Sequence, residues 1–158
     1  MIEEGDKIPS VTLQVKTPEG VKDVTTEQLF GGKKVVVFGV PGAYTPTCTA
    51  KHLPGFVEKA AELRGKGVDR ILCTSVNDAW VMDAWGREAG ADGKVEMIAD
   101  GSAKLTKALG LELDLTDKGM GLRSKRFALV VADGTVTSIA VDDRGLDATS
   151  AESVLGKL

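Results

Sequence analysis

Apolar residues repeat along this chain with two periods, which predict strands in some segments and helices in others. Val11, Leu13 and Val15 alternate with other residues as in a strand, and TPEG predicts a turn into a second strand, VKDVT. The run KKVVVFGV is apolar without alternation, which is typical of a strand buried on both faces. The pattern therefore predicts an N-terminal hairpin followed by a central buried strand.

Strand and helix patterns alternate after this central strand. Further strands are predicted at DRILCTSV and, shorter, at VEMIAD. Helical patterns cover the segment from the cysteine loop to AAELRGKG, then AWVMDAWGREAG, which Asn77 or Asp78 can cap, and SAKLTKALG. The segments KRFALVV, ADG and TVTSIAV predict a hairpin, and Thr149 with Glu152 predicts a capping box for a last helix, SAESVLGKL. The connection LELDLTDKGMGLRS receives no assignment.

This order of elements indicates an α/β fold with a mixed central β-sheet flanked by helices. A thioredoxin-like topology fits it best, with the N-terminal β-hairpin as an extension. No repeat or linker interrupts the chain, and 158 residues with 42% hydrophobic content can bury a sizeable core. We therefore expect a single domain over residues 1–158.

Charge and composition argue against several classes of partner. The net charge of −3 comes from acids and bases spread along the chain, so no basic face for nucleic acid or anionic lipid stands out. No apolar stretch approaches the roughly 20 residues of a membrane span, and the N-terminus does not resemble a secretory leader. We expect a cytoplasmic protein, in which the two cysteines are thiols.

A metal site is a weak alternative for one of these cysteines. Cys48 and His52 are four residues apart and could share a helical face, but His52 is the single histidine. Zinc usually takes four ligands, so acidic residues would have to complete the site. We expect no metal.

Cys48 stands at the predicted start of a helix, just after the central strand. Thr45 is a natural N-cap and Pro46 suits the first helical position, which puts Cys48 in the first turn. Free N–H groups and the helix dipole favour an anion there, so we expect a reactive thiolate. The alternative is an inert cysteine that fills space in the core.

The surrounding residues limit what such a thiolate could attack. Lys51 occupies the place that a CxxC partner would need, and no arginine follows soon after Cys48 as a phosphatase loop would require. His52 is better placed to pack or cap than to act as the base of a hydrolase. The remaining kind of substrate is a two-electron oxidant with an oxygen that the thiolate can attack.

The segment VPGAYTPTC carries the PxxxTxxC motif of peroxiredoxins as Pro41, Thr45 and Cys48. FGVPGAYTPTCTAKHLPGF, SVNDAWVMDAWG and RSKRFALVVADGTV resemble the type II (type V-like, atypical) branch of that family, within the thioredoxin-like superfamily. The resemblance extends from GDKIP to the last helix. It implies a thiol peroxidase that reduces hydrogen peroxide and alkyl hydroperoxides, an antioxidant enzyme of cell redox homeostasis without a bound cofactor.

The resemblance also implies roles for individual residues. Cys48 would be the peroxidatic cysteine, which becomes a sulfenic acid, Thr45 would hydrogen-bond thiolate and peroxide, and Pro41 would limit solvent access. The family's active-site arginine matches Arg126, where a guanidinium can stabilise the thiolate and polarise the departing oxygen. Arg123 is a second candidate that supports the loop.

Cys73, inside a predicted strand, is expected to be a core residue, although it could resolve the sulfenic acid if the first helical turn unwinds. We expect an external thiol, from glutaredoxin with glutathione or from thioredoxin, to recycle Cys48. The resemblance implies a homodimer through a face that could include Tyr44 and Trp80, whereas Trp85 could lie in the core or at that interface. His52 is expected to hold the helix or the loop.

Two other functions remain open at this point. The same oxidisable cysteine could serve a redox sensor or holdase that signals to a partner. A catalytically silent thioredoxin-like interaction domain is the third reading.

Overall fold

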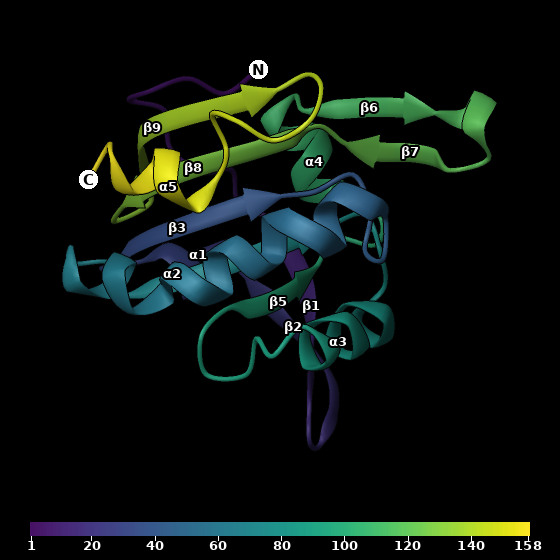
Figure 1. Cartoon of the computed structure of the whole chain (residues 1–158), viewed down its shortest axis with the longest axis horizontal. Coiled ribbons are helices and arrows are strands. Elements are labelled where there is room, and N and C mark those ends of the chain that lie inside the picture. The colour runs from purple at the N-terminus through teal and green to yellow at the C-terminus, as the bar shows by residue number, and fades with distance from the viewer.

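A seven-stranded mixed β-sheet forms the centre of the structure, a computed structural model that describes residues 1–158 (Figure 1). The strand order across the sheet is β2-β1-β5-β4-β3-β8-β9. These strands are β1 (Thr12–Thr17), β2 (Gly20–Thr25), β3 (Lys34–Gly39), β4 (Arg70–Ser75), β5 (Glu96–Ala99), β8 (Arg126–Ala132) and β9 (Thr135–Asp142).

Parallel and antiparallel pairs both occur in this sheet. β4 pairs in parallel with β3 and β5, while β8 is antiparallel to both β3 and β9. The N-terminal hairpin joins the opposite side through one antiparallel pair, Gln14 with Ala99. The predicted extension is thus the edge of the main sheet, and the predicted mixed α/β architecture is confirmed.

Helices cover both faces of the sheet and enclose two separate cores. One face carries α2 (Leu53–Gly65), α3 (Ala79–Glu88) and α5 (Ala151–Leu155), and the other carries α1 (Thr26–Phe30) and α4 (Lys104–Leu109). Strand β3 contributes to both cores, because Val36 and Phe38 point to the first and Val35 and Val37 to the second. This alternation explains why the run is apolar throughout.

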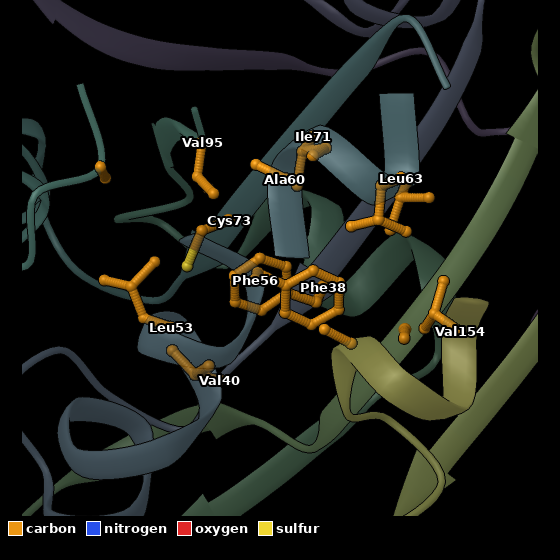
Figure 2. Packing of buried hydrophobic residues seen from close by; sticks show 14 of the residues in the cluster. Phe38, Val40, Leu53, Phe56, Ala60, Leu63, Ile71, Cys73, Val95 and Val154 are labelled. Carbon is orange, nitrogen blue, oxygen red and sulfur yellow. The ribbon is translucent and has the colours of Figure 1, made fainter. Parts of the chain in front are cut away.

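The core between α2 and the sheet is built around two aromatic rings. Phe38 of β3 and Phe56 of α2 stack face to face (Figure 2). Their ring centroids are 4.0 Å apart and their planes are 7° from parallel. Cys73 of β4 lies in the same cluster, with Leu53 and Val40 nearby. This packing fixes the N-terminal part of α2 against the sheet.

None of the helices combines the length and the apolar composition that a membrane span requires.

The helix caps agree with the sequence at one end and correct it at another. Asp78 caps α3 by accepting the Val81 N–H at 2.9 Å, one of the two predicted alternatives. The capping box predicted for Thr149 is wrong, because Ser150 is the N-cap of α5. The Thr149 hydroxyl instead donates to a carboxylate oxygen of Asp142 at 2.7 Å.

Two elements had no counterpart in the sequence predictions. Helix α1 begins with a capping box between Thr25 and Gln28. The unassigned connection contains a separate antiparallel hairpin, β6 (Glu112–Leu115) and β7 (Gly121–Ser124), joined by a 3-10 turn over Thr116–Lys118. In Figure 1 this hairpin extends beyond one end of β8 and β9.

Candidate active site

The loop that leads from β3 into the following helix is held by hydrogen bonds at several points. The side-chain oxygen of Asn77 accepts the Ala43 N–H at 3.0 Å, and the Thr45 hydroxyl donates to the Gly42 carbonyl at 2.7 Å. Tyr44 has a left-handed φ of 63°. Such a conformation costs a non-glycine residue about 1–3 kcal/mol, so the surrounding contacts must maintain it.

The helical segment begins at Pro46, immediately after Thr45, as the sequence predicts. The Thr45 carbonyl accepts the Thr49 N–H at 3.0 Å, which closes the first turn around Cys48. The predicted capping by the Thr45 side chain is not seen, since no N–H of the first turn donates to its hydroxyl, which itself donates to the Gly42 carbonyl. Cys48 therefore lies in the first turn, near the positive end of the helix dipole.

The turn that starts at Cys48 is wider than an α-helical turn. Residues Cys48–His52 form a π-helical turn, in which the Leu53 N–H donates to the Cys48 carbonyl. This irregular turn lies directly before α2, whose second residue is Pro54. Single π turns of this kind occur often at functional sites, and Pro54 has no N–H to donate to the preceding turn.

Cys48 and Arg126 come together although 78 residues separate them in the chain. Arg126 is the first residue of β8, whose pairing with β3 sets it beside the start of the cysteine loop. Its Nη2 donates to Cys48 Sγ at 3.2 Å, and Cys48 is fully buried. A guanidinium keeps its proton, so Arg126 places a fixed positive charge and a hydrogen-bond donor at the sulfur.

His52 connects Arg126 to the C-terminal part of the chain. The His52 Nε2 lies 3.0 Å from the Thr149 carbonyl oxygen, which can only accept, so Nε2 carries the proton. Nδ1 is then the acceptor for Arg126 Nη1 at 2.7 Å. Burial, and then the charge of Arg126, lower the pKa of His52 to about 3, so the ring is neutral at physiological pH. His52 orients the arginine instead of acting as a base.

Arg123 supports the loop and does not bond to Cys48. Its Nε donates to the Met120 carbonyl at 2.9 Å and its Nη1 to the Val76 carbonyl at 3.4 Å. A Cβ at Gly42 would lie 3.1 Å from Nη1 of Arg123, so this side chain packs closely against the cysteine loop. Arg126 is therefore the arginine at the sulfur.

A small cavity of about 170 Å³ lies next to this arginine. Pro41 and Arg126 line it together with Asp142 and residues of the neighbouring loops. Larger hollows exist elsewhere, such as one of about 420 Å³ between α2 and α5, but they contain neither Pro41 nor Arg126. Arg126 connects this cavity to the buried Cys48 sulfur, which does not itself line it.

The second cysteine lies inside the same core, on β4. Cys73 is fully buried and, like Cys48, is a free thiol. Burial, and then the nearby Cys48, raise the pKa of the Cys73 thiol well above its usual value. A buried thiol that resists ionisation is a poor nucleophile. No group of three or more His, Cys, Asp or Glu side chains is arranged to hold a metal ion.

The two tryptophans and the single tyrosine divide into one core residue and two exposed ones. Trp85 is buried, and its Nε1 donates to the Thr49 hydroxyl at 3.2 Å. Trp80 is 63% exposed and Tyr44 is 45% exposed. The Tyr44 ring lies 6.4 Å from that of Trp85 between centroids, so the exposed tyrosine borders α3.

Sequence reasoning missed Asp142, the last residue of β9. Its carboxylate accepts four hydrogen bonds from the segment that leads into α5. An acidic residue at a strand end, followed within a few residues by threonine and serine, was the available signal. It was too general to identify the bonds.

Comparison with known proteins identifies the class that this fold and site define. The Redoxin family profile matches residues 3–155, so the chain belongs to the redoxin family. The rice protein Peroxiredoxin-2E-2, chloroplastic (Oryza sativa subsp. japonica) is 51% identical over 98% of this chain and 71% of its own length. Peroxiredoxin-2B of Arabidopsis thaliana is 49% identical over 98% of this chain and 96% of its own.

A solved structure shows the same likeness. The reduced Prx3 of Vibrio vulnificus in complex with H2O2 superposes with a TM-score of 0.95 at 46% identity, over 99% of both chains. Within the redoxins, the chain is a type II peroxiredoxin. It is a thiol-dependent peroxidase, and the predicted family and thioredoxin-like fold are confirmed.

Proposed function

We propose that Cys48 is the peroxidatic cysteine of this enzyme. The observation that carries the proposal is the bond of 3.2 Å from Arg126 Nη2 to the buried Cys48 sulfur. The thiolate attacks one peroxide oxygen, an S–O bond forms and the O–O bond breaks. Sulfur is oxidised to sulfenic acid, and the departing oxygen takes a proton and leaves as water or alcohol.

Arg126, Thr45 and Pro41 assist this step in different ways. Arg126 donates to the thiolate and to the oxygen on which charge develops. The Thr45 hydroxyl donates its hydrogen bond to the Gly42 carbonyl oxygen, so its lone pairs remain available to accept a hydrogen bond from the O–H of a peroxide. Pro41 lines the cavity beside Arg126, where it restricts water, while His52 and Arg123 support Arg126 and the loop.

Hydrogen peroxide and small alkyl hydroperoxides are the proposed substrates. The cavity at Arg126 has a volume of about 170 Å³, which suits small molecules. The Vibrio vulnificus relative was crystallised with H2O2, which supports the same substrate here. The peroxide supplies the oxidising equivalents and an external thiol the electrons, so we propose that the reaction needs no bound cofactor.

The reductant is proposed to be an external thiol, from glutaredoxin with glutathione or from thioredoxin. Cys73 is buried and protonated, which argues against it as the resolving residue. A reductant thiolate attacks the sulfur of the sulfenic acid and releases water, and a second thiol then reduces the mixed disulfide.

Peroxide consumption by the wild type, Cys48→Ser and Cys73→Ser tests these assignments, with each reductant system supplied separately. We expect Cys48→Ser to be inactive and Cys73→Ser to turn over normally. Full activity of Cys48→Ser would refute the proposal, and loss in Cys73→Ser would indicate an internal disulfide. Rapid oxidation without turnover by either reductant would favour a redox sensor.

We also propose a cytoplasmic homodimer. The exposed rings of Tyr44 and Trp80 give α3 and the cysteine loop an apolar surface that a second copy could cover. Two free thiols suit a reducing compartment. Sedimentation of the wild type and Trp80→Ala tests the first point, and fluorescence microscopy of a tagged chain in its native cell tests the second.

A further inference from the structure

The carboxylate of Asp142 organises the segment between β9 and α5. Its Oδ2 accepts the backbone N–H groups of Asp147 and Thr149, at 2.9 and 3.0 Å, and the Thr149 hydroxyl at 2.7 Å. Its Oδ1 accepts the Ala148 N–H at 3.1 Å. One side chain thus fixes three successive peptide units, and the segment is folded around it.

This arrangement also fixes a carbonyl group in the core. Thr149 is fully buried, and its carbonyl oxygen accepts the Nε2–H of His52 at 3.0 Å. That bond determines the tautomer of His52 and leaves Nδ1 as the acceptor for Arg126. If Thr149 moved, His52 would lose the partner that fixes both its ring orientation and its proton.

Asp142 does not pair directly with the arginine, although the two residues are cross-strand neighbours. They lie opposite each other in the β8–β9 register, and opposite charges in such positions usually attract. The ion pairs of the structure nevertheless do not include this pair. The carboxylate is occupied by the loop, and the guanidinium remains free to bond to His52 and to Cys48.

We propose that Asp142 is a positioning residue for the peroxidase reaction, which acts through Thr149 and His52 to hold Arg126 against the Cys48 sulfur. The proposal rests on the proposed function of Arg126 and adds to it a residue that does not touch the sulfur. It makes the geometry at Cys48 depend on a surface segment far from it in sequence. Because the peptide units of residues 147–149 are held by the Asp142 carboxylate, substitution of Asp142 alone can release them.

Single-turnover oxidation of the reduced protein by hydrogen peroxide tests the proposal without any reductant. Asp142→Ala removes all four bonds, whereas Asp142→Asn keeps an acceptor oxygen at nearly the same place. Asp147→Ala is the matched control, because it removes a carboxylate of the same segment that accepts no hydrogen bond and keeps the backbone N–H. Alkylation of Cys48 by iodoacetamide, followed by mass spectrometry, is measured in parallel.

Asp142→Ala is expected to lower the peroxide rate constant about tenfold or more, within the range that small misplacements of catalytic groups produce. Alkylation attacks the same sulfur beside Arg126, so it should fall as well, but much less than oxidation, because iodoacetamide does not need the arginine at its departing group. Asp142→Asn should recover most of the rate, and Asp147→Ala should stay within about twofold of the wild type. In an Arg126→Lys background, Asp142→Ala should have little further effect, because two residues that act through one group are not additive.

Three results would overturn the proposal. They are equal rates for Asp142→Ala and Asp147→Ala, an equal fall in oxidation and alkylation, and an undiminished effect of Asp142→Ala in the Arg126→Lys background. The last would mean that Asp142 acts independently of Arg126. The 15N resonances of the single histidine distinguish failure of this proposal from failure of the proposed function. A change of the His52 resonances in Asp142→Ala would support the contacts from Asp142 through Thr149 to His52. If Cys48→Ser nevertheless consumed peroxide like the wild type, only the peroxidatic role of Cys48 would be refuted.

Discussion

Acid should destabilise this protein through His52, and substitution of His52 by Gln should remove that part of the pH dependence. The pKa of the folded state is about 3, against 6.5 for an unperturbed histidine, because burial and Arg126 both disfavour the imidazolium. Between these two values the unfolded chain takes up a proton that the folded chain does not. The contribution of the neutral His52 to the free energy of unfolding is therefore complete above about pH 6.5, and it is lost as the pH falls toward 3.

The magnitude follows from the separation of the two pKa values. One pH unit corresponds to about 1.4 kcal/mol for a single proton, so the free energy of unfolding should fall by roughly 4–5 kcal/mol over the whole interval. At neutral pH, His52→Gln should be less stable than the wild type by about 1–3 kcal/mol, because the bonds at Arg126 and Thr149 are perturbed. The two stability curves should then converge as the pH is lowered.

Urea unfolding at pH 7, 6 and 5 measures this difference, and carboxylates common to both proteins cancel in the comparison. The chain has one histidine, so the NMR titration of its imidazole is read without assignment. Parallel stability curves for the wild type and His52→Gln would refute the reasoning. An imidazole that titrates near pH 6.5 in the folded protein would do so as well.

Other substitutions test the remaining parts of the site and of the core. Arg126→Met should lower the rate of Cys48 oxidation by about 10- to 100-fold, the loss expected for one bond to a charged group, and stopped-flow mixing with peroxide would show a smaller role if the rate changed less than threefold. Gly39→Ala should destabilise the fold by about 1–3 kcal/mol or more, since its Cβ would lie 2.0 Å from a ring carbon of Phe127; an unchanged melting temperature would contradict this packing. Cys73→Ser should cost about 1–3 kcal/mol in urea unfolding, because a buried hydroxyl would lack a partner, while turnover is retained.

Local patterns in the sequence were enough to predict most of the regular elements and to place Cys48 in the first turn of a helix after the central strand. The apolar run at β3, the threonine and proline before Cys48, and the peroxiredoxin motif all lie within short segments. Such patterns work because helix initiation is decided mainly by neighbouring residues, and because a strand buried on both faces must be apolar throughout. Helix α1 and the β6–β7 hairpin were missed because they are short and depend on contacts with the rest of the chain.

The sequence by itself therefore determined the fold class and the family, and it singled out Cys48 as the proposed reactive residue. The environment of that residue was decided only by the tertiary structure. The pairing of β8 with β3 brings Arg126 to Cys48, and the burial of His52 makes it a neutral acceptor for that arginine. These properties depend on distance and desolvation between segments far apart in the chain, and no local pattern encodes either of them.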